Sequence, residues 1–348
     1  MIKWVDAPGQ KIRETLSARG MLLKEFALRM GMTEKHVSKL INGEVQLTVE
    51  TSVRLETVLG IPAAEWNAME ASYRESKIRW DGERLAERDV ALAQCFPYAE
   101  MTRLGWVPGV KNDREKVLRL QDFFEVVDLC HLENEQLFGV ACRKLSLHER
   151  EDLTILSWTQ EGRKRARDLR LEPFQVKKLE KLIPEMREWT LEKPTTFLPK
   201  LREALADCGI GLVILERIRG LNIQSAAFPS GSGVVVALTA KVMDDSEFWH
   251  RLFRELGHAF LGHVWQEGGV AEQDERDAIL WARNALLPRK EFDALKQLGS
   301  FTEKNVCEFA GEQGIAVGIV IGRLQAEGLI SGGRLNRLKA KYDFSKKA

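Results

Sequence analysis

One segment of the sequence places histidines and a glutamate at spacings that could bind a metal ion. Glu255 and His258 form the second half of an H-E-x-x-H pattern, in which two histidines one helical turn apart share a zinc ion and the glutamate acts as general base. Arg254 stands at the first histidine position, and a guanidinium has no lone pair to give a cation. His250 is about 12 Å of helix rise from His258, and His263 faces elsewhere, so neither supplies the missing ligand. The pattern therefore predicts a vestigial site without zinc.

Strands and a helix must position these residues. Three short β-rich runs, over about 211–216, 222–228 and 233–239, are separated by glycine, proline and serine turns. A long helix follows, and Asp244, Asp245 and Ser246 are its candidate N-cap residues. The sequence predicts an α+β region with a small three-stranded sheet and an H-E-x-x-H-like helix.

Residues 245–263 resemble the active-site helix of ImmA/IrrE-type zinc peptidases, whose pattern is "D.FwftlfHElgHlllgH". The third zinc ligand of that family is a glutamate in a segment that aligns with residues 277–288, which puts Asp277 at the ligand position. The resemblance thus implies a degenerate peptidase-like domain. Its vestigial metal residues are Arg254, His258 and Asp277, and its vestigial catalytic residue is Glu255. We expect an ion pair of Arg254 with Glu255 or Asp277 to fill the site.

A later segment, residues 314–325, resembles the "GIapgIVvGRLQ" sequence of long HigA-like antitoxins that carry this domain. A core helix would also explain its apolar residues. We expect Arg323 and Gln325 to be exposed, and the sequence assigns no chemistry to them.

A second candidate site lies near the N-terminus. A helix over about 22–30 ends at Gly31, which suits a left-handed turn, and Thr33 is placed to cap a following helix that buries Val37 and Leu40. Polar residues at the start of such a helix can reach base edges in the major groove, where lysine donates to guanine and glutamate accepts from cytosine. An ordinary α-hairpin with a solvated face is the alternative. The predicted DNA-binding residues are Thr33, Glu34, Lys35, Ser38, Lys39 and Asn42.

Residues 9–75 resemble the XRE-type helix-turn-helix of phage repressors, and more closely that of HigA-type antitoxins. The shared pattern is matched by Asn42, Gly43, Leu47, Thr48, Arg54, Leu55, Gly60, Trp66 and Tyr73. The resemblance implies a sequence-specific repressor that binds a palindromic operator in double-stranded DNA as a homodimer. It also implies the antitoxin of a type II toxin–antitoxin module, with a RelE-like mRNA-interferase toxin as partner.

Two alternatives remain open for the whole chain. One is an active zinc metallopeptidase that cleaves a repressor. The other is a prophage or stress regulator that senses a ligand through its C-terminal domain. In the leading interpretation the peptidase-like domain binds a toxin or effector. No cofactor is expected, and zinc is the one metal that the residue pattern would suggest.

Composition limits the function classes only weakly. The 348 residues carry a net charge of +1, and residues 1–75 hold ten basic and ten acidic side chains, so a DNA-binding face must come from the arrangement of charge. The longest apolar stretch, 314–321, is too short to span a bilayer, and the N-terminus lacks a secretory signal. Five scattered cysteines without C-x-x-C spacing indicate reduced thiols. We expect a cytoplasmic protein that does not bind membranes.

Four parts are expected in a mainly α chain. Helical periodicity dominates the first two hundred residues, with breaks at Gly20, Gly31, Gly43 and Gly60. We predict a helix-turn-helix bundle over 1–78, a helical connecting region over 79–165, the peptidase-like domain over 166–300 and a C-terminal helical segment over 301–348.

Overall fold

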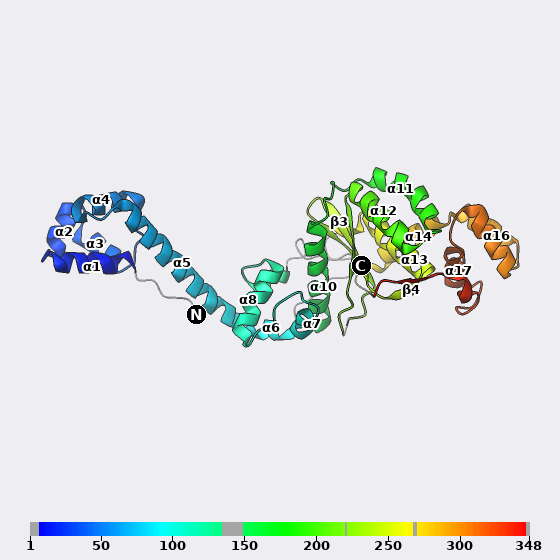
Figure 1. The fold of residues 1–348 in the computed structure, drawn as a ribbon, viewed down its shortest axis with the longest axis horizontal. Helices are drawn as coiled ribbons and strands as arrows, with labels where there is room; N and C mark the ends of the chain where they lie inside the picture. The colour runs from blue at the N-terminus through cyan, green and yellow to red at the C-terminus, as the bar shows by residue number, and fades with distance from the viewer. Residues whose placement is uncertain (1–6, 134–148, 220, 267–269, 346–348) are drawn as a thin grey trace. The chain divides into compact units, whose positions relative to one another are not determined.

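A computed structural model describes residues 7–133, 149–219, 221–266 and 270–345, except the side chains of residues 80–88. The chain divides into two compact units, Met1–Arg88 and Asp89–Ala348 (Figure 1). The finer division at residues 78, 165 and 300 stays a prediction. Within the described residues, no helix is both long and apolar enough to cross a membrane.

The first unit is helical. It consists of α1 (Pro8–Ala18), α2 (Leu23–Met30), α3 (Glu34–Ile41), α4 (Val49–Leu59) and α5 (Ala63–Arg88). Gly31 and Gly60 end α2 and α4 in the left-handed region, with φ of 63° and 68°, as the sequence predicted for Gly31. The helices enclose one core, whose fully buried side chains include Ile12, Phe26, Val37, Leu55 and Trp66.

Close contacts fix the position of α3 in this unit. A Cβ on Gly9 would lie 1.9 Å from the carbonyl oxygen of Ile41, so α1 meets the end of α3 at backbone distance. Arg54 Nη1 donates to the carbonyl of Met30 at 3.2 Å, and Arg19 donates to the last carbonyls of α4. Because helix C-termini leave carbonyls unpaired, the two arginines stabilise the ends of α2 and α4.

The second unit begins with short helices. They are α6 (Val90–Cys95), α7 (Tyr98–Arg103), α8 (Asp113–Phe124) and η1 (Leu129–Glu133), followed by α10 (Arg150–Arg167). Asp89 Oδ2 accepts from the backbone N–H of Leu129 at 2.8 Å, and Gln160 Nε2 donates to the carbonyl of Phe123 at 3.1 Å. The second bond attaches α10 to α8, and α10 in turn packs on β1 and β3 of the sheet.

The sheet has three strands, β1 (Ile210–Leu215), β2 (Ser225–Ser230) and β3 (Gly233–Thr239). The order is β1-β3-β2, with β1 parallel and β2 antiparallel to β3. β2 begins at Ser225, three residues later than predicted, where Ser225 pairs with Leu238 near the end of β3. A separate antiparallel pair joins β4 (Val242–Asp244) to β5 (Lys341–Asp343).

Further helices complete the second unit. They are α11 (Val176–Trp189), α12 (Pro194–Asp207), α13 (Asp245–Phe260), α14 (Glu272–Leu286), α15 (Arg289–Gln297), α16 (Glu303–Gln313) and α17 (Val317–Ala326), with short turns η2 (His263–Trp265) and η3 (Asn336–Leu338). α13 is central, since it contacts β2, β3, α14 and α17. Its N-cap is Asp244, which accepts from the N–H of Glu247 at 2.8 Å. The fold class, mainly helical with an N-terminal helix-turn-helix and a small three-stranded sheet, is confirmed.

The expected exposure of Arg323 was wrong, and Gln325 is half-buried. Arg323 is 5% exposed, lies over the ring of Phe292 at 4.6 Å and bonds to Glu327 at 2.9 Å. Gln325 Nε2 donates to the carbonyls of residues 332 and 334 at 3.1 and 3.0 Å. Phe292 of α15 covers Arg323, and the segment around residues 332–334 partly covers Gln325.

Candidate functional site

The first candidate site is the outer face of α3. Thr33 caps this helix, since its Oγ1 accepts from the N–H of His36 at 3.2 Å, as predicted. Val37, Leu40 and Ile41 point into the core. The remaining face of the helix is therefore free to meet a partner.

The predicted DNA-binding residues share this helix and its two ends. Five of them are exposed and Ser38 is half-buried: the exposed ones are Thr33, Glu34, Lys35, Lys39 and Asn42. Asn42 follows the last turn of α3, and its Oδ1 accepts from Arg13 of α1. Their contact with DNA stays a prediction.

Two residues beside this surface escaped the sequence analysis. His36 is exposed next to Lys35, and its place in the polar run could have suggested it. Arg13 reaches α3 only because α1 packs against the end of that helix, and no local pattern signals such a contact.

The second candidate site surrounds Arg254 on α13. Its guanidinium donates to Glu255 Oε1 at 2.6 and 3.1 Å, to Glu275 Oε1 at 3.0 Å and to Ser225 Oγ at 3.0 Å. Ser225 Oγ also donates to Glu255 Oε1 at 2.8 Å. The expected Arg254–Glu255 ion pair is confirmed. Because Glu255 is only 2% exposed, the arginine compensates a carboxylate buried away from water.

Two histidines extend the cluster. His258 Nε2 lies 3.0 Å from Glu275 Oε2, and His258 Nδ1 lies 3.2 Å from His263 Nδ1. His263 Nε2 is 3.6 Å from Asp274 Oδ1. The expectation that His263 faces elsewhere was wrong, because Gly262, at φ 81°, turns the chain back after α13 ends.

The protonation of these groups follows from their surroundings. The hydrogen bond with His258, together with the charge of Arg254, lowers the pKa of Glu275. Burial lowers the pKa of His263. Burial also lowers the pKa of His250 to about 4, and its Nδ1 donates to the carbonyl of Ser246 at 2.8 Å. His250 therefore takes no part in the cluster, as expected.

The structure brings Glu275, and not Asp277, to the position facing His258. Asp277 Oδ1 instead accepts from Gln273 Nε2 at 2.9 Å along the same helix. The buried face of α14 contains Ala278, Ala282 and Leu286. Glu275 precedes Ala278 by three residues, so it lies on the same face of α14, whereas Asp277 is rotated by about 100° from Ala278 around the helix axis.

The cluster does not fit zinc. His258 and Glu275 offer two ligand atoms, whereas catalytic zinc sites use three protein ligands and structural sites four. The guanidinium of Arg254 already pairs with both Glu255 and Glu275, so a metal cation would meet an adjacent positive charge.

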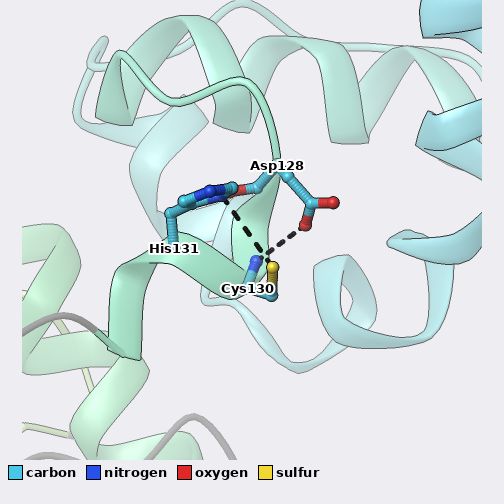
Figure 2. Close-up of side chains that lie close together, drawn as sticks. All are labelled: Asp128, Cys130 and His131. Atoms are coloured by element: carbon cyan, nitrogen blue, oxygen red, sulfur yellow. Dashed lines mark hydrogen bonds between the residues drawn. The ribbon is translucent and has the colours of Figure 1, made fainter.

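A different group, Asp128, Cys130 and His131, brings three possible metal-ligand atoms close together. Among the described residues it is the group whose possible ligand atoms all lie within 4.8 Å of one another (Figure 2). Cys130 Sγ is 3.9 Å from His131 Nδ1, and the Cys130 N–H donates to Asp128 Oδ1 at 3.0 Å. Cys130 and His131 are exposed, and the closeness follows from one turn of chain at η1. The group carries no assigned role.

Comparison with known proteins concerns the first site. Residues 10–66 match a family model described as helix-turn-helix. An uncharacterized HTH-type transcriptional regulator of Escherichia coli strain K12, YddM, is 34% identical over 59 residues, which are 17% of this chain and 63% of that protein. The chain therefore spans just under two thirds of the length of this curated relative. The matched residues include most of α1, all of α2 to α4 and the start of α5, so the N-terminal part of the chain is a helix-turn-helix domain.

Proposed function

We propose that this protein is a DNA-binding transcription regulator that reads double-stranded DNA with α3. The observation that carries the proposal is the two-sided character of α3 within a helix-turn-helix domain. It buries Val37 and Leu40 in the core and leaves Lys35 and Lys39 exposed one turn apart. Lysine can donate to guanine O6 and N7 or neutralise a phosphate. The description of the E. coli relative as a transcriptional regulator supports the proposal.

The other exposed residues complete the proposed interface. Glu34 can accept from cytosine N4, and Thr33, Ser38 and Asn42 can bond to bases or phosphates. One domain of this size covers a single half-site, so we propose a homodimer on a palindromic operator with half-sites about 34 Å apart.

The double substitution Lys35→Ala, Lys39→Ala tests α3 as the reading helix. If both lysines contact phosphate, the slope of log K for DNA binding against log salt concentration becomes less steep by about 1.8 per half-site. The affinity at 0.1 M salt then falls about 60-fold per half-site. The probe is a duplex that the parent protein enriches from a random pool, with binding followed by gel shift over a salt series. The matched control is Lys177→Ala, Lys181→Ala, which removes two exposed lysines at the same spacing from α11. Equal binding by the α3 variant and the parent would refute the assignment.

The finer role is also a proposal. By its resemblance to HigA-type antitoxins, the protein represses its own operon and neutralises a RelE-like toxin. Residues 166–300 then form an ImmA/IrrE-like domain without metal that binds the toxin or an effector, and the cytoplasm is the compartment where such a regulator acts. Arg254 in the place of a ligand supports a binding role over an active peptidase. Co-purification with the product of a small neighbouring reading frame tests the antitoxin role, and its absence would favour the ligand-sensing regulator.

A further inference from the structure

A cavity of about 790 Å³ opens in the second unit between α13, α14 and α17, beside the start of β2. This volume lies in the range of small-molecule sites. Ile223, Ile279 and Ala282 supply an apolar part of its wall. The charged part comprises four cations, Arg251, Arg254, Arg283 and Lys339, and two carboxylates, Asp244 and Glu247.

Two groups of ion pairs at or next to the wall leave positive charge uncompensated. Glu247 is shared between Arg251 and Lys241, whose Nζ lies 2.6 Å from Glu247 Oε1. Glu327 is likewise shared between Arg323 at 2.9 Å and Arg283 at 3.5 Å. In each group one carboxylate faces two cations, so each group carries a net positive charge.

Two other cations of the wall are compensated, since Lys339 pairs with Asp244 and Arg254 pairs with Glu255 and Glu275. Lys339, whose side chain is 9% exposed, lies 3.5 Å from Asp244 and is held by Gln325 Oε1 at 2.9 Å. Among the described residues, Arg251 Nη1 is a buried donor with no hydrogen-bond partner. Burial lowers the pKa of His250, and the nearby positive charges of Arg283, Arg323 and Lys339 lower it further.

We infer that this cavity binds a small organic anion that carries a phosphate group or several carboxylates. Its charged end pairs with Arg251, Arg283 and Lys339, and its carbon skeleton lies against Ile223 and Ile279. An anion is favoured because buried donors without acceptors are costly and charge-assisted hydrogen bonds are strong. The cavity wall includes Arg254, so the arginine that fills the vestigial site also contributes to this surface. The inference goes beyond the proposed function, because it does not depend on DNA binding.

Titration calorimetry on the full chain tests the inference. The probes are glucose 6-phosphate and citrate, which separate the phosphate from the polycarboxylate source, and glucose as the uncharged reference. Ionic strength is held constant with sodium chloride, so that general screening is the same in every titration. We expect saturable binding of at least one of the two anions and none of glucose.

Two variants change the cavity without emptying the core. Arg283→Gln removes one of its cations, and Ala326→Glu adds a carboxylate at an exposed position of the wall. Each should weaken anion binding at least about tenfold, the loss expected for one charged hydrogen bond. The matched controls on α15, Arg289→Gln and Ala294→Glu, make the same charge changes outside the cavity and should bind like the parent.

The outcomes decide the matter. Binding of neither anion at millimolar concentration would overturn the inference, as would equal weakening by the α15 controls. Operator binding is measured separately with the same preparations, so a failure of the cavity proposal and a failure of the DNA proposal are distinguishable.

Discussion

Substituting Arg254→His should convert the cluster on α13 into a zinc site. The variant would carry histidines at positions 254 and 258, one turn apart on α13, opposite the carboxylate of Glu275 on α14. Glu255 would lie beside the metal, in the place of the general base. The unmodified protein should contain no stoichiometric zinc, because Arg254 holds the position.

The distances support this conversion. Ligand bonds of about 2.1 Å at a tetrahedral angle place two ligand atoms about 3.4 Å apart. His258 Nε2 and Glu275 Oε2 are already 3.0 Å apart, so a few tenths of an ångström of movement suffices. At a free zinc concentration 100 times Kd, binding stabilises the folded protein by about 2.7 kcal/mol. For a domain of this size that raises Tm by roughly 5–11 °C.

The assay combines elemental analysis with thermal melts in the presence and absence of zinc, on protein purified without a metal-affinity tag or chelator. A second substitution distinguishes the two candidates for the third ligand. Adding Glu275→Ala to Arg254→His should abolish zinc binding, whereas adding Asp277→Ala should leave it unchanged, because Asp277 bonds to Gln273 along α14.

Three results would refute this reasoning. About one zinc per chain in the unmodified protein, lost on His258→Ala, would mean that Arg254 does not block the site. No zinc in Arg254→His would mean that the framework no longer supports a metal. Loss of zinc with Asp277→Ala but not with Glu275→Ala would return the third ligand to the residue that the sequence alignment selects.

Three further predictions concern stability and assembly. Gly9→Ala should destabilise the helix-turn-helix domain by about 1–3 kcal/mol, because the new Cβ would lie 1.9 Å from the carbonyl oxygen of Ile41. The control Gly311→Ala, which places its Cβ in open space, should not lower stability, and chemical denaturation compares the two variants. In the folded protein the pKa of Glu275 lies below its ordinary value of 4.5, so the contribution of this carboxylate to stability is present above pH 4.5 and is lost as the pH falls through the lower, folded-state pKa. Glu275→Gln should therefore flatten the curve of unfolding free energy against pH in that acid range. An unchanged curve would contradict this prediction. Light scattering should show a dimer on operator DNA, and a monomer both free and bound would exclude the proposed assembly.

Local chemistry predicted the helix-turn-helix well. Gly31 supplies the left-handed turn and Thr33 the cap, and both act within a few residues of their own position. The alternation of buried and exposed residues on α3 likewise follows from helical periodicity. Arg13 beside Asn42 was not predictable in this way, because the contact depends on how closely α1 approaches α3 at Gly9.

Around Arg254 the sequence predicted the elements and one ion pair, and missed two partners. Glu275 could have been found, because it lies on the same face of α14 as the apolar Ala278, whereas the alignment of a conventional ligand position selected Asp277. His263 could not have been placed by helical spacing, because Gly262 ends the helical geometry between it and His258.

The arrangement around Arg254 also explains how the cluster can persist without a metal. Glu255 is 2% exposed, and a carboxylate buried to that degree requires a cation or several donors. Arg254 supplies the positive charge and donates at once to Glu255, Glu275 and Ser225. A neutral residue at position 254 would leave Glu255 with the hydroxyl of Ser225 and an uncompensated charge. The guanidinium therefore does for the fold what a bound cation would do.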